Sequence, residues 1–186
     1  MDIGLVGQMS RSRSRNAADQ LIAAHPIAGS EKTGVENASE TLLDGKATIL
    51  TPTEETDSPH FDRAKQFWLQ TGSRLIVMSP EEHDRRLAAI SHVPHLVSSL
   101  LARLPDDESL RLIGSGWKDM TRVAAGDPGM WTAICEHNRT AILGELDRVE
   151  SEIARLRRCL SEADSKALTQ WLVEAKERKN LSLRQS

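Results

Sequence analysis

Three short clusters in this 186-residue chain carry side chains that could do chemistry. The first runs from His25 to Glu31, and its histidine stands beside Pro26 and shortly before Gly29. An imidazole titrates near neutral pH, so a histidine in a loop-like setting can be presented to a ligand with its tautomer fixed by a neighbour. A lone histidine before a proline is also a common structural feature. The residues alone leave both interpretations open.

The second cluster holds His92 and His95, three residues apart on one side of an expected helix. Two imidazoles at this spacing could bind a metal ion, but no carboxylate stands three or four residues further on to complete an obvious site. Pro94, between them, favours another interpretation. A proline inside a helix removes one backbone donor and frees the carbonyl of Ile90, so a kink is expected there. Such a bend could offer backbone and imidazole donors to an anionic ligand.

The third cluster follows two glycines and contains Lys118 and Arg122, four residues apart and therefore on one face of a predicted helix. Two cations on one face suggest an anion site, in which Arg122 could clamp a carboxylate through two parallel hydrogen bonds. Ordinary surface cations would have the same spacing. Both interpretations stay open at this point.

The N-terminal segment ends a short apolar run at Gly7, as the first strand of a dinucleotide-binding unit does. The glycines that should follow are replaced by Met9 and Ser12, whose side chains would intrude where backbone must approach a pyrophosphate. Residues 10–15 alternate serine and arginine, which is more typical of a solvated segment than of an RNA-binding arm. Gly7 is therefore interpreted as vestigial.

The elements that must position these clusters fall into two classes. Residues 46–52 and 74–78 are predicted to be strands, separated by an amphipathic helix of about a dozen residues that ends near Gln70 and is closed by Gly72. This is a β-α-β fragment. From Ser79 onward the pattern is helical, beginning with a serine cap and a proline in the first turn.

A second long helix is predicted to begin at Asp127-Pro128, and a final helix carries Trp171. Apolar residues in the second helix alternate spacings of four and three, which is typical of a helix that packs against another. These residues are Ile142, Leu146, Val149, Ile153, Leu156 and Leu160. The run is short for an independent coiled coil, so packing within a bundle or across a subunit interface is expected.

The order of motifs resembles that of the prephenate and arogenate dehydrogenases, the tyrosine-pathway family. The motifs are HPIAGSEKTGVE, ILTPT, SPEEHD, SHVPH and GSGWKDMTRVAAGDPGMW, and the match runs from about His25 to the C-terminus. The resemblance implies a mainly α protein, with a C-terminal helical dimerisation domain preceded by a small α/β remnant of a dinucleotide-binding domain. The expected divisions are residues 1–24, a vestigial strand and junction, residues 25–78, the α/β part, and residues 79–186, the helical substrate-binding and dimerisation domain.

The resemblance also implies a reaction and its residues. Hydride leaves ring carbon 4 of prephenate or arogenate for NAD or NADP while a histidine accepts the hydroxyl proton, and aromatisation drives loss of carbon dioxide. His25 is the implied base, with a pKa near the working pH. The implied substrate contacts are Arg122 as carboxylate clamp, His95 and Lys118 near the pocket, Glu31 as gate and Trp131 lent by a neighbouring subunit of a homodimer.

One departure from the family bears on activity. Only seventeen residues separate Gly7 from His25, fewer than the ~30 that one βαβ unit requires. We therefore expect the chain alone to bind neither NAD nor NADP and to be inactive as an isolated dehydrogenase. The alternative is a non-catalytic partner that dimerises with a full-length dehydrogenase and regulates it. The sequence does not choose between prephenate and arogenate, or between NAD and NADP.

Composition limits the other partners. A net charge of −3 gives no general attraction to nucleic acid or to an anionic membrane. No apolar run approaches the ~18 residues that span a bilayer, and no signal peptide pattern opens the chain. The two cysteines, Cys135 and Cys159, have no metal-binding spacing. A cytoplasmic protein with a small-molecule or protein partner is expected, with no metal.

Overall fold

The computed structural model describes residues 21–28 and 39–183. The predicted first strand, Gly7, the serine and arginine stretch and Glu31 lie outside these residues. The chain divides into two compact units, residues 1–142 and 143–186. The prediction of a mainly helical protein with a small α/β part is confirmed.

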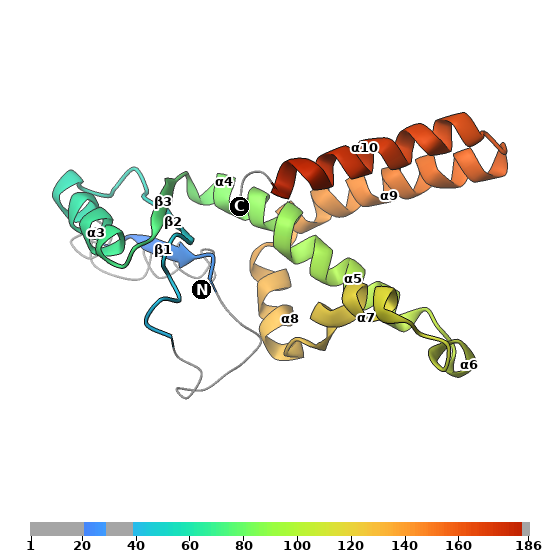
Figure 1. The fold of residues 1–186 in the computed structure, drawn as a ribbon. Coiled ribbons are helices and arrows are strands. Elements are labelled where there is room, and N and C mark those ends of the chain that lie inside the picture. The colour runs from blue at the N-terminus through green and yellow to red at the C-terminus, as the bar shows by residue number, and fades with distance from the viewer. Residues whose placement is uncertain (1–20, 29–38, 184–186) are drawn as a thin grey trace. The chain divides into compact units, whose positions relative to one another are not determined.

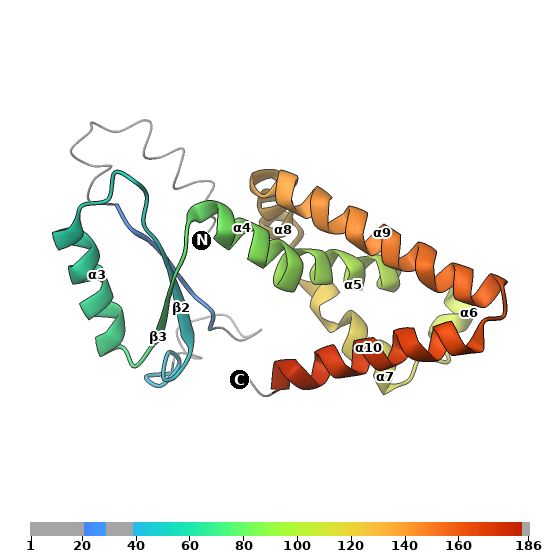
Figure 2. The same ribbon diagram turned by 90° about the horizontal axis from the view of Figure 1, so that it is seen from above.

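The α/β part of the first unit is a three-stranded sheet with the order β1-β2-β3. The strands are β1 (Ala23–Pro26), β2 (Ala47–Thr51) and β3 (Arg74–Val77), and helix α3 (Ser58–Gln70) connects the last two. Strand β2 pairs parallel with β3 and antiparallel with β1. Figure 2 shows α3 along one face of this sheet. The predicted β-α-β fragment is confirmed, with one further strand that was not expected.

Local signals explain where α3 begins and ends. Asp57 caps its N-terminus by accepting a hydrogen bond from the backbone N–H of His60 at 2.8 Å. Gly72 follows the helix with a φ of +79°, which only glycine adopts without strain. A side chain at Gly72 would also collide with Asp44. The turn that leads into β3 therefore depends on this glycine.

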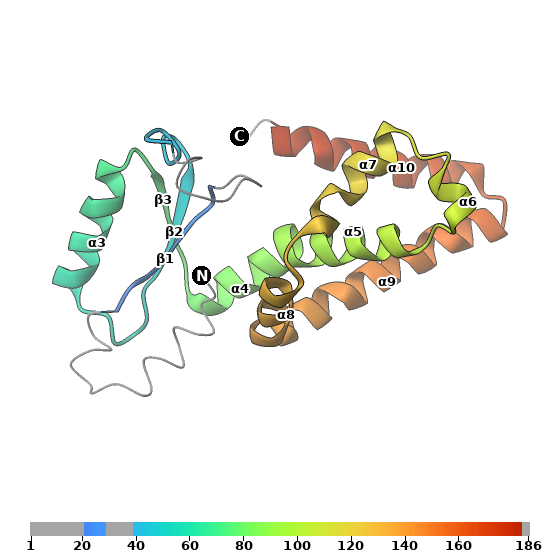
Figure 3. The same cartoon turned by 90° about the horizontal axis from the view of Figure 1, so that it is seen from below.

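The helical part of the first unit begins directly after β3. Its helices are α4 (Pro80–Leu87), η2 (Ala88–His92), α5 (Val93–Arg103), α6 (Asp107–Leu110), α7 (Ser115–Thr121), η3 (Arg122–Ala125) and α8 (Pro128–His137). Figure 1 shows α4 and α5 as one nearly continuous rod, and Figure 3 shows α7 beside α5. Buried apolar side chains hold the unit together from the sheet to the start of the next helix: Ala23, Ile49, Leu50, Leu87, Ala88, Val93 and Ile142.

The α-helix is interrupted just before Pro94, where a kink was expected, and the interruption takes the form of a π-helical turn. In this turn the N–H of Val93 bonds to the carbonyl of Ala88, five residues earlier. Because Pro94 has no N–H to bond with Ile90, a wider turn just before it accommodates the lost α-helical bond. The side chains that follow this turn are consequently rotated about the helix axis, relative to the positions they would have in a regular α-helix.

The second unit is a helical hairpin. Helix α9 (Arg139–Ser161) contributes its residues from Leu143 onward, and α10 (Ser165–Leu183) returns alongside it. Trp171 donates a hydrogen bond from Nε1 to Oε2 of Glu152 at 2.7 Å, and Arg155 pairs with Glu174 at 3.0 Å. No residue of α10 is buried. None of the described helices is both long and apolar enough to cross a bilayer.

Candidate functional site

His25 lies on strand β1, opposite Ile49 of β2. The expectation of a loop-like setting is therefore wrong, because the histidine is held by a sheet. The apolar run Leu21-Ile22-Ala23-Ala24 that precedes it is a strand signal that could have been recognised. A rigid strand fixes the imidazole more firmly than a loop would.

Helix α4 supplies the side chain that contacts His25. Nδ1 of His25 lies 2.8 Å from Nε2 of His83, and Nδ1 of His83 lies 2.9 Å from Oδ1 of Asp84. The ring of His83 is buried. Ser79 starts α4 by accepting a hydrogen bond from the N–H of Glu82 at 3.1 Å, as the cap signal predicts. The carboxylate of Glu82 accepts a hydrogen bond from Arg86, one turn further along the helix.

A cavity of about 180 Å³ lies at this contact. Its lining combines four polar groups around His25 with apolar side chains: His25, His83, Asp84, Leu87, Ser91, His92, Trp131 and Ile134. A second, more open hollow of about 400 Å³ adjoins His25 on the side of Pro26, Leu87 and Ile90. A cavity that combines apolar side chains with convergent polar groups has the character of a small-molecule site.

Asn138 joins three elements beside this cavity. It ends α8 and is buried, and its Nδ2 donates to the carbonyl oxygen of Asp84 at 2.8 Å. The same nitrogen lies 3.0 Å from Nδ1 of His92. Neither Asn138 nor Asp84 was predicted from the sequence to be a site residue. Nothing in the spacing of these residues, 54 positions apart, signals that they meet.

His95 and Trp131 stack on one another, with ring centroids 3.4 Å apart and planes 12° from parallel. A side chain at Gly126 would collide with the Trp131 ring and crowd His95, so this glycine allows the stack to pack closely. Trp131 also lines the cavity around His25. The stack forms within one chain. A contribution of Trp131 to a neighbouring subunit stays a prediction.

The structure does not bring Lys118 and Arg122 to the cavity around His25. Lys118 lies on α7 and is exposed. The α-helix ends at Thr121, and the exposed Arg122 lies in the 3-10 turn that follows, so the expectation that both cations share one α-helix is wrong. Thr121 bonds from its hydroxyl to the carbonyl of Trp117 at 2.7 Å at this helix end.

Burial, the largest cause, and the positive charge that His83 and His92 can carry together lower the pKa of His25 from 6.5 to about 4. The groups that face His25 are His83 and Asp84 of α4 and His92 of η2. The expectation of a pKa near the working pH is therefore wrong. His25 is neutral at neutral pH and ready to accept a proton, although it is a weaker base than an unperturbed imidazole. Burial also lowers the pKa of His95.

The lowered pKa predicts acid sensitivity. Because folded His25 binds a proton less tightly than the unfolded chain does, its contribution to stability is complete above pH 6.5 and is lost as the pH falls towards 4. The shift corresponds to at most about 3 kcal/mol, and because the ring is partly exposed we expect about 1–2 kcal/mol. Urea unfolding from pH 7.5 to 4.5 measures the loss. In His25→Gln the unfolding free energy should decrease less between pH 7.5 and 4.5 than in the wild type. An equal decrease would contradict the assignment of this pH dependence to His25.

Within the described ranges, no group of three or more histidine, cysteine, aspartate or glutamate side chains could hold a metal ion. A dinucleotide has no fitting site there either. Such a site needs a glycine-rich turn between a strand and a helix, with backbone N–H groups aimed at the phosphates. Gly45 and Gly72, the glycines of the described α/β part, both lie in turns that lead into strands. The described residues therefore do not fit this cofactor.

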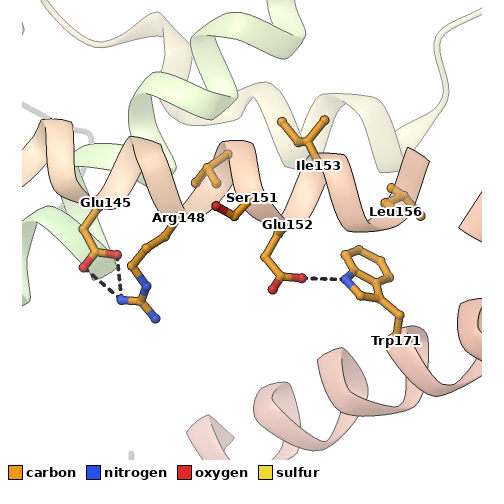
Figure 4. A pocket seen from close by; sticks show the side chains of 8 residues that line it. Glu145, Arg148, Ser151, Glu152, Ile153, Leu156 and Trp171 are labelled. Carbon is orange, nitrogen blue, oxygen red and sulfur yellow. Dashed lines mark hydrogen bonds and ion pairs between the residues drawn. The ribbon is translucent and has the colours of Figure 1, made fainter. Parts of the chain in front are cut away.

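A hollow of about 470 Å³ lies on the helical hairpin. Figure 4 shows its lining, with Ile153 and Leu156 on α9 and Trp171 opposite on α10. Its polar groups are already paired, Glu152 with Trp171 and Arg148 with Glu145. An open, mostly apolar groove whose polar groups are already paired is better suited to contact with another protein than to catalysis. We therefore place the candidate reaction site at His25.

Two family models match the chain. The model described as "Prephenate dehydrogenase, dimerization domain" matches residues 79–174, and "Prephenate dehydrogenase, nucleotide-binding domain" matches residues 1–77. Prephenate dehydrogenase of Bacillus subtilis is 37% identical over 173 residues, which cover 89% of this chain and 47% of that protein. The chain thus spans about half the length of this curated relative.

Solved structures agree with these matches. Prephenate dehydrogenase from A. aeolicus, in complex with hydroxyphenyl propionate and NAD+, superposes with a TM-score of 0.81 at 33% identity. The match covers 89% of this chain and 60% of that one. Synechocystis arogenate dehydrogenase superposes with a TM-score of 0.77 at 27% identity, over 88% of this chain and 62% of that one.

Proposed function

The chain belongs to the prephenate dehydrogenase family, and we propose that β1, α4 and η2 build the substrate side of a site that oxidises prephenate or arogenate. In this proposal His25 accepts the proton of the substrate hydroxyl. The observation that carries it is the position of His25, which lines a small cavity while its Nδ1 is engaged by His83. The other ring nitrogen is then left for the substrate.

The neutral state of His25 supports this role. A general base must be unprotonated when the substrate arrives, and a pKa of about 4 keeps the ring neutral at neutral pH. As the hydroxyl proton moves to Nε2, the ring becomes a cation. Asp84 can then offset the new charge through His83, because a carboxylate stabilises a nearby imidazolium. The two electrons must leave for an acceptor whose site the described residues do not contain.

The remaining proposed substrate contacts are Trp131, His95, Arg122, Lys118 and Glu31. The flat stack of Trp131 and His95 adjoins the cavity and suits a six-membered ring. Arg122, Lys118 and Glu31 are proposed from the family resemblance alone. Arg122 and Lys118 are outside the cavity lining, so carboxylate binding by them requires that η3 and α7 approach the ligand. NAD or NADP is proposed as the acceptor of the complete reaction, and a cytoplasmic location stays a prediction.

Calorimetry tests this proposal. We expect the 186-residue chain to bind prephenate, and His25→Ala to weaken binding about tenfold through loss of one hydrogen bond to the hydroxyl. NAD+ and NADP+ should give no binding heat, and the chain alone should not turn prephenate or arogenate over. His60→Ala is the matched control, because His60 lies on α3, away from the cavity, and its ring pairs with Asp57. Equal prephenate binding by the His25 and His60 variants would contradict the role of His25.

We also propose that the chain forms a homodimer through the helical hairpin. The family model that covers residues 79–174 is described as a dimerization domain. Large apolar side chains are exposed along both helices of the hairpin: Leu143, Ile153, Leu160, Leu172, Val173, Leu181 and Leu183. A hairpin with this surface and almost no buried core gains stability when a second copy covers it. Pairing with a full-length dehydrogenase, the alternative function, would use the same surface.

A further inference from the structure

A linear series of hydrogen bonds leads from an acidic side chain to His25. It starts at the carboxylate of Asp84, passes through both nitrogens of His83 and ends at Nδ1 of His25, with distances of 2.9 and 2.8 Å. Asp84 and His83 are neighbours on α4, whereas His25 lies 58 residues earlier on β1. His83 is 4% exposed, so water does not compete effectively for its nitrogens. The series therefore joins the helical part to the sheet through side chains alone.

The order of donors and acceptors in this series is fixed by its first member. An ionised carboxylate only accepts, so Nδ1 of His83 must carry a proton. A neutral imidazole has one N–H, which makes Nε2 of His83 an acceptor. Nδ1 of His25 must then be the donor to His83. In neutral His25 the remaining nitrogen, Nε2, consequently carries a lone pair and no proton.

We propose that Asp84 and His83 are positioning residues that hold His25 in the tautomer whose Nε2 can accept a proton. Its use in catalysis rests on the function proposed above, although the tautomer itself does not. No described residue forms a hydrogen bond with Nε2 of His25, and the ring borders the cavity. Without this series the two tautomers of His25 would compete, and the tautomer with a proton on Nε2 could not act as a base.

The packing of α4 holds Asp84 and His83 in position for these hydrogen bonds. The carbonyl of Asp84 accepts a hydrogen bond from buried Asn138, and Leu87, one turn further along, is also buried. The rings of His25 and His83 lie 5.1 Å apart with planes inclined by 51°. This inclination is compatible with an in-line N–H···N contact and not with face-to-face stacking. A purely structural histidine pair would need no carboxylate behind it.

Nuclear magnetic resonance of the full chain tests the proposal without substrate or cofactor. Two-bond proton–nitrogen correlations on histidine-labelled protein at pH 7.5 distinguish protonated from unprotonated ring nitrogens. We expect both His25 and His83 to be protonated at Nδ1. In Asp84→Asn the amide can donate to Nδ1 of His83, which reverses each donor in turn and moves the proton of His25 to Nε2. Asp147→Asn, an exposed change on α9, should leave both rings as in the wild type.

Two results would overturn the proposal: a proton on Nε2 of His25 in the wild-type chain, or an unchanged tautomer of His25 in both Asp84→Asn and His83→Phe. If Asp84→Asn proves unfolded, His83→Phe decides alone, because it removes the acceptor and should leave His25 as a mixture of tautomers. Failure of prephenate to bind would contradict the proposed function, but it would leave the nitrogen signals that report the tautomers unaffected. A reversed tautomer in Asp84→Asn with normal prephenate binding would support the positioning role, because a substrate hydroxyl can accept a hydrogen bond as well as donate one.

Discussion

Ile153→Asp should convert the protein from a dimer into a monomer. Ile153 is 47% exposed on the hairpin and borders its apolar groove (Figure 4). In a dimer that covers this groove, an aspartate would be an unpaired carboxylate removed from water, which costs several kcal/mol. We expect the dissociation constant to rise at least about a hundredfold, equivalent to about 3 kcal/mol. Size-exclusion chromatography with light scattering at micromolar concentrations measures the change.

The matched control is Ala154→Asp, on the same helix and one residue along. It introduces the same charge at an exposed position outside the apolar series of α9. Because Ala154 projects about 100° around the helix from Ile153, its variant should stay dimeric. Circular dichroism of both variants should match the wild type, since neither side chain is buried within the hairpin. A wild-type monomer, or a dimeric Ile153→Asp variant, would refute an interface at this groove.

Features that depend on neighbouring residues could be predicted from the sequence. The cap at Ser79 works within one turn, and the loss of a helical bond at Pro94 follows from the covalent structure of proline. Strand β2 is buried along nearly its whole length, as its short apolar run indicates, whereas Arg74 and Val77 at the ends of β3 are exposed. Gly72 is needed because the turn after α3 requires a positive φ. Each of these signals lies within a few residues of the structure that it specifies.

Features that depend on distant residues were missed or misplaced. Strand β1 was missed although the apolar run at its start is a strand signal, because so short a run indicates a strand only once its partner β2 is known. The contact between His25 and His83 depends on how α4 packs against the sheet, and no local pattern encodes it. The pKa of His25 was misjudged for the same reason, since burial and neighbouring charges are consequences of tertiary structure. Arg122 was placed on a helix that ends one residue before it.

The site consequently depends on packing that the sequence does not reveal. His25 and His83 come from the sheet and from α4, and Trp131 comes from α8. Asn138 is the residue that ties the end of α8 to α4 and to His92. The side-chain amide of Asn138 thus links elements on two sides of the cavity. Its removal should disturb both stability and the geometry around His25.

Asn138→Ala should cost about 1–3 kcal/mol of unfolding free energy, because it leaves the carbonyl of Asp84 and Nδ1 of His92 without this donor in partly buried surroundings. Urea unfolding measures the loss, and hydrogen exchange of α4 and η2 amides should accelerate with it. Asn180→Ala removes the same amide from an exposed position on α10, so its effect should stay within about 0.5 kcal/mol. If the two variants lose equal stability, the two hydrogen bonds of Asn138 contribute little and the walls of the cavity are held by apolar packing instead.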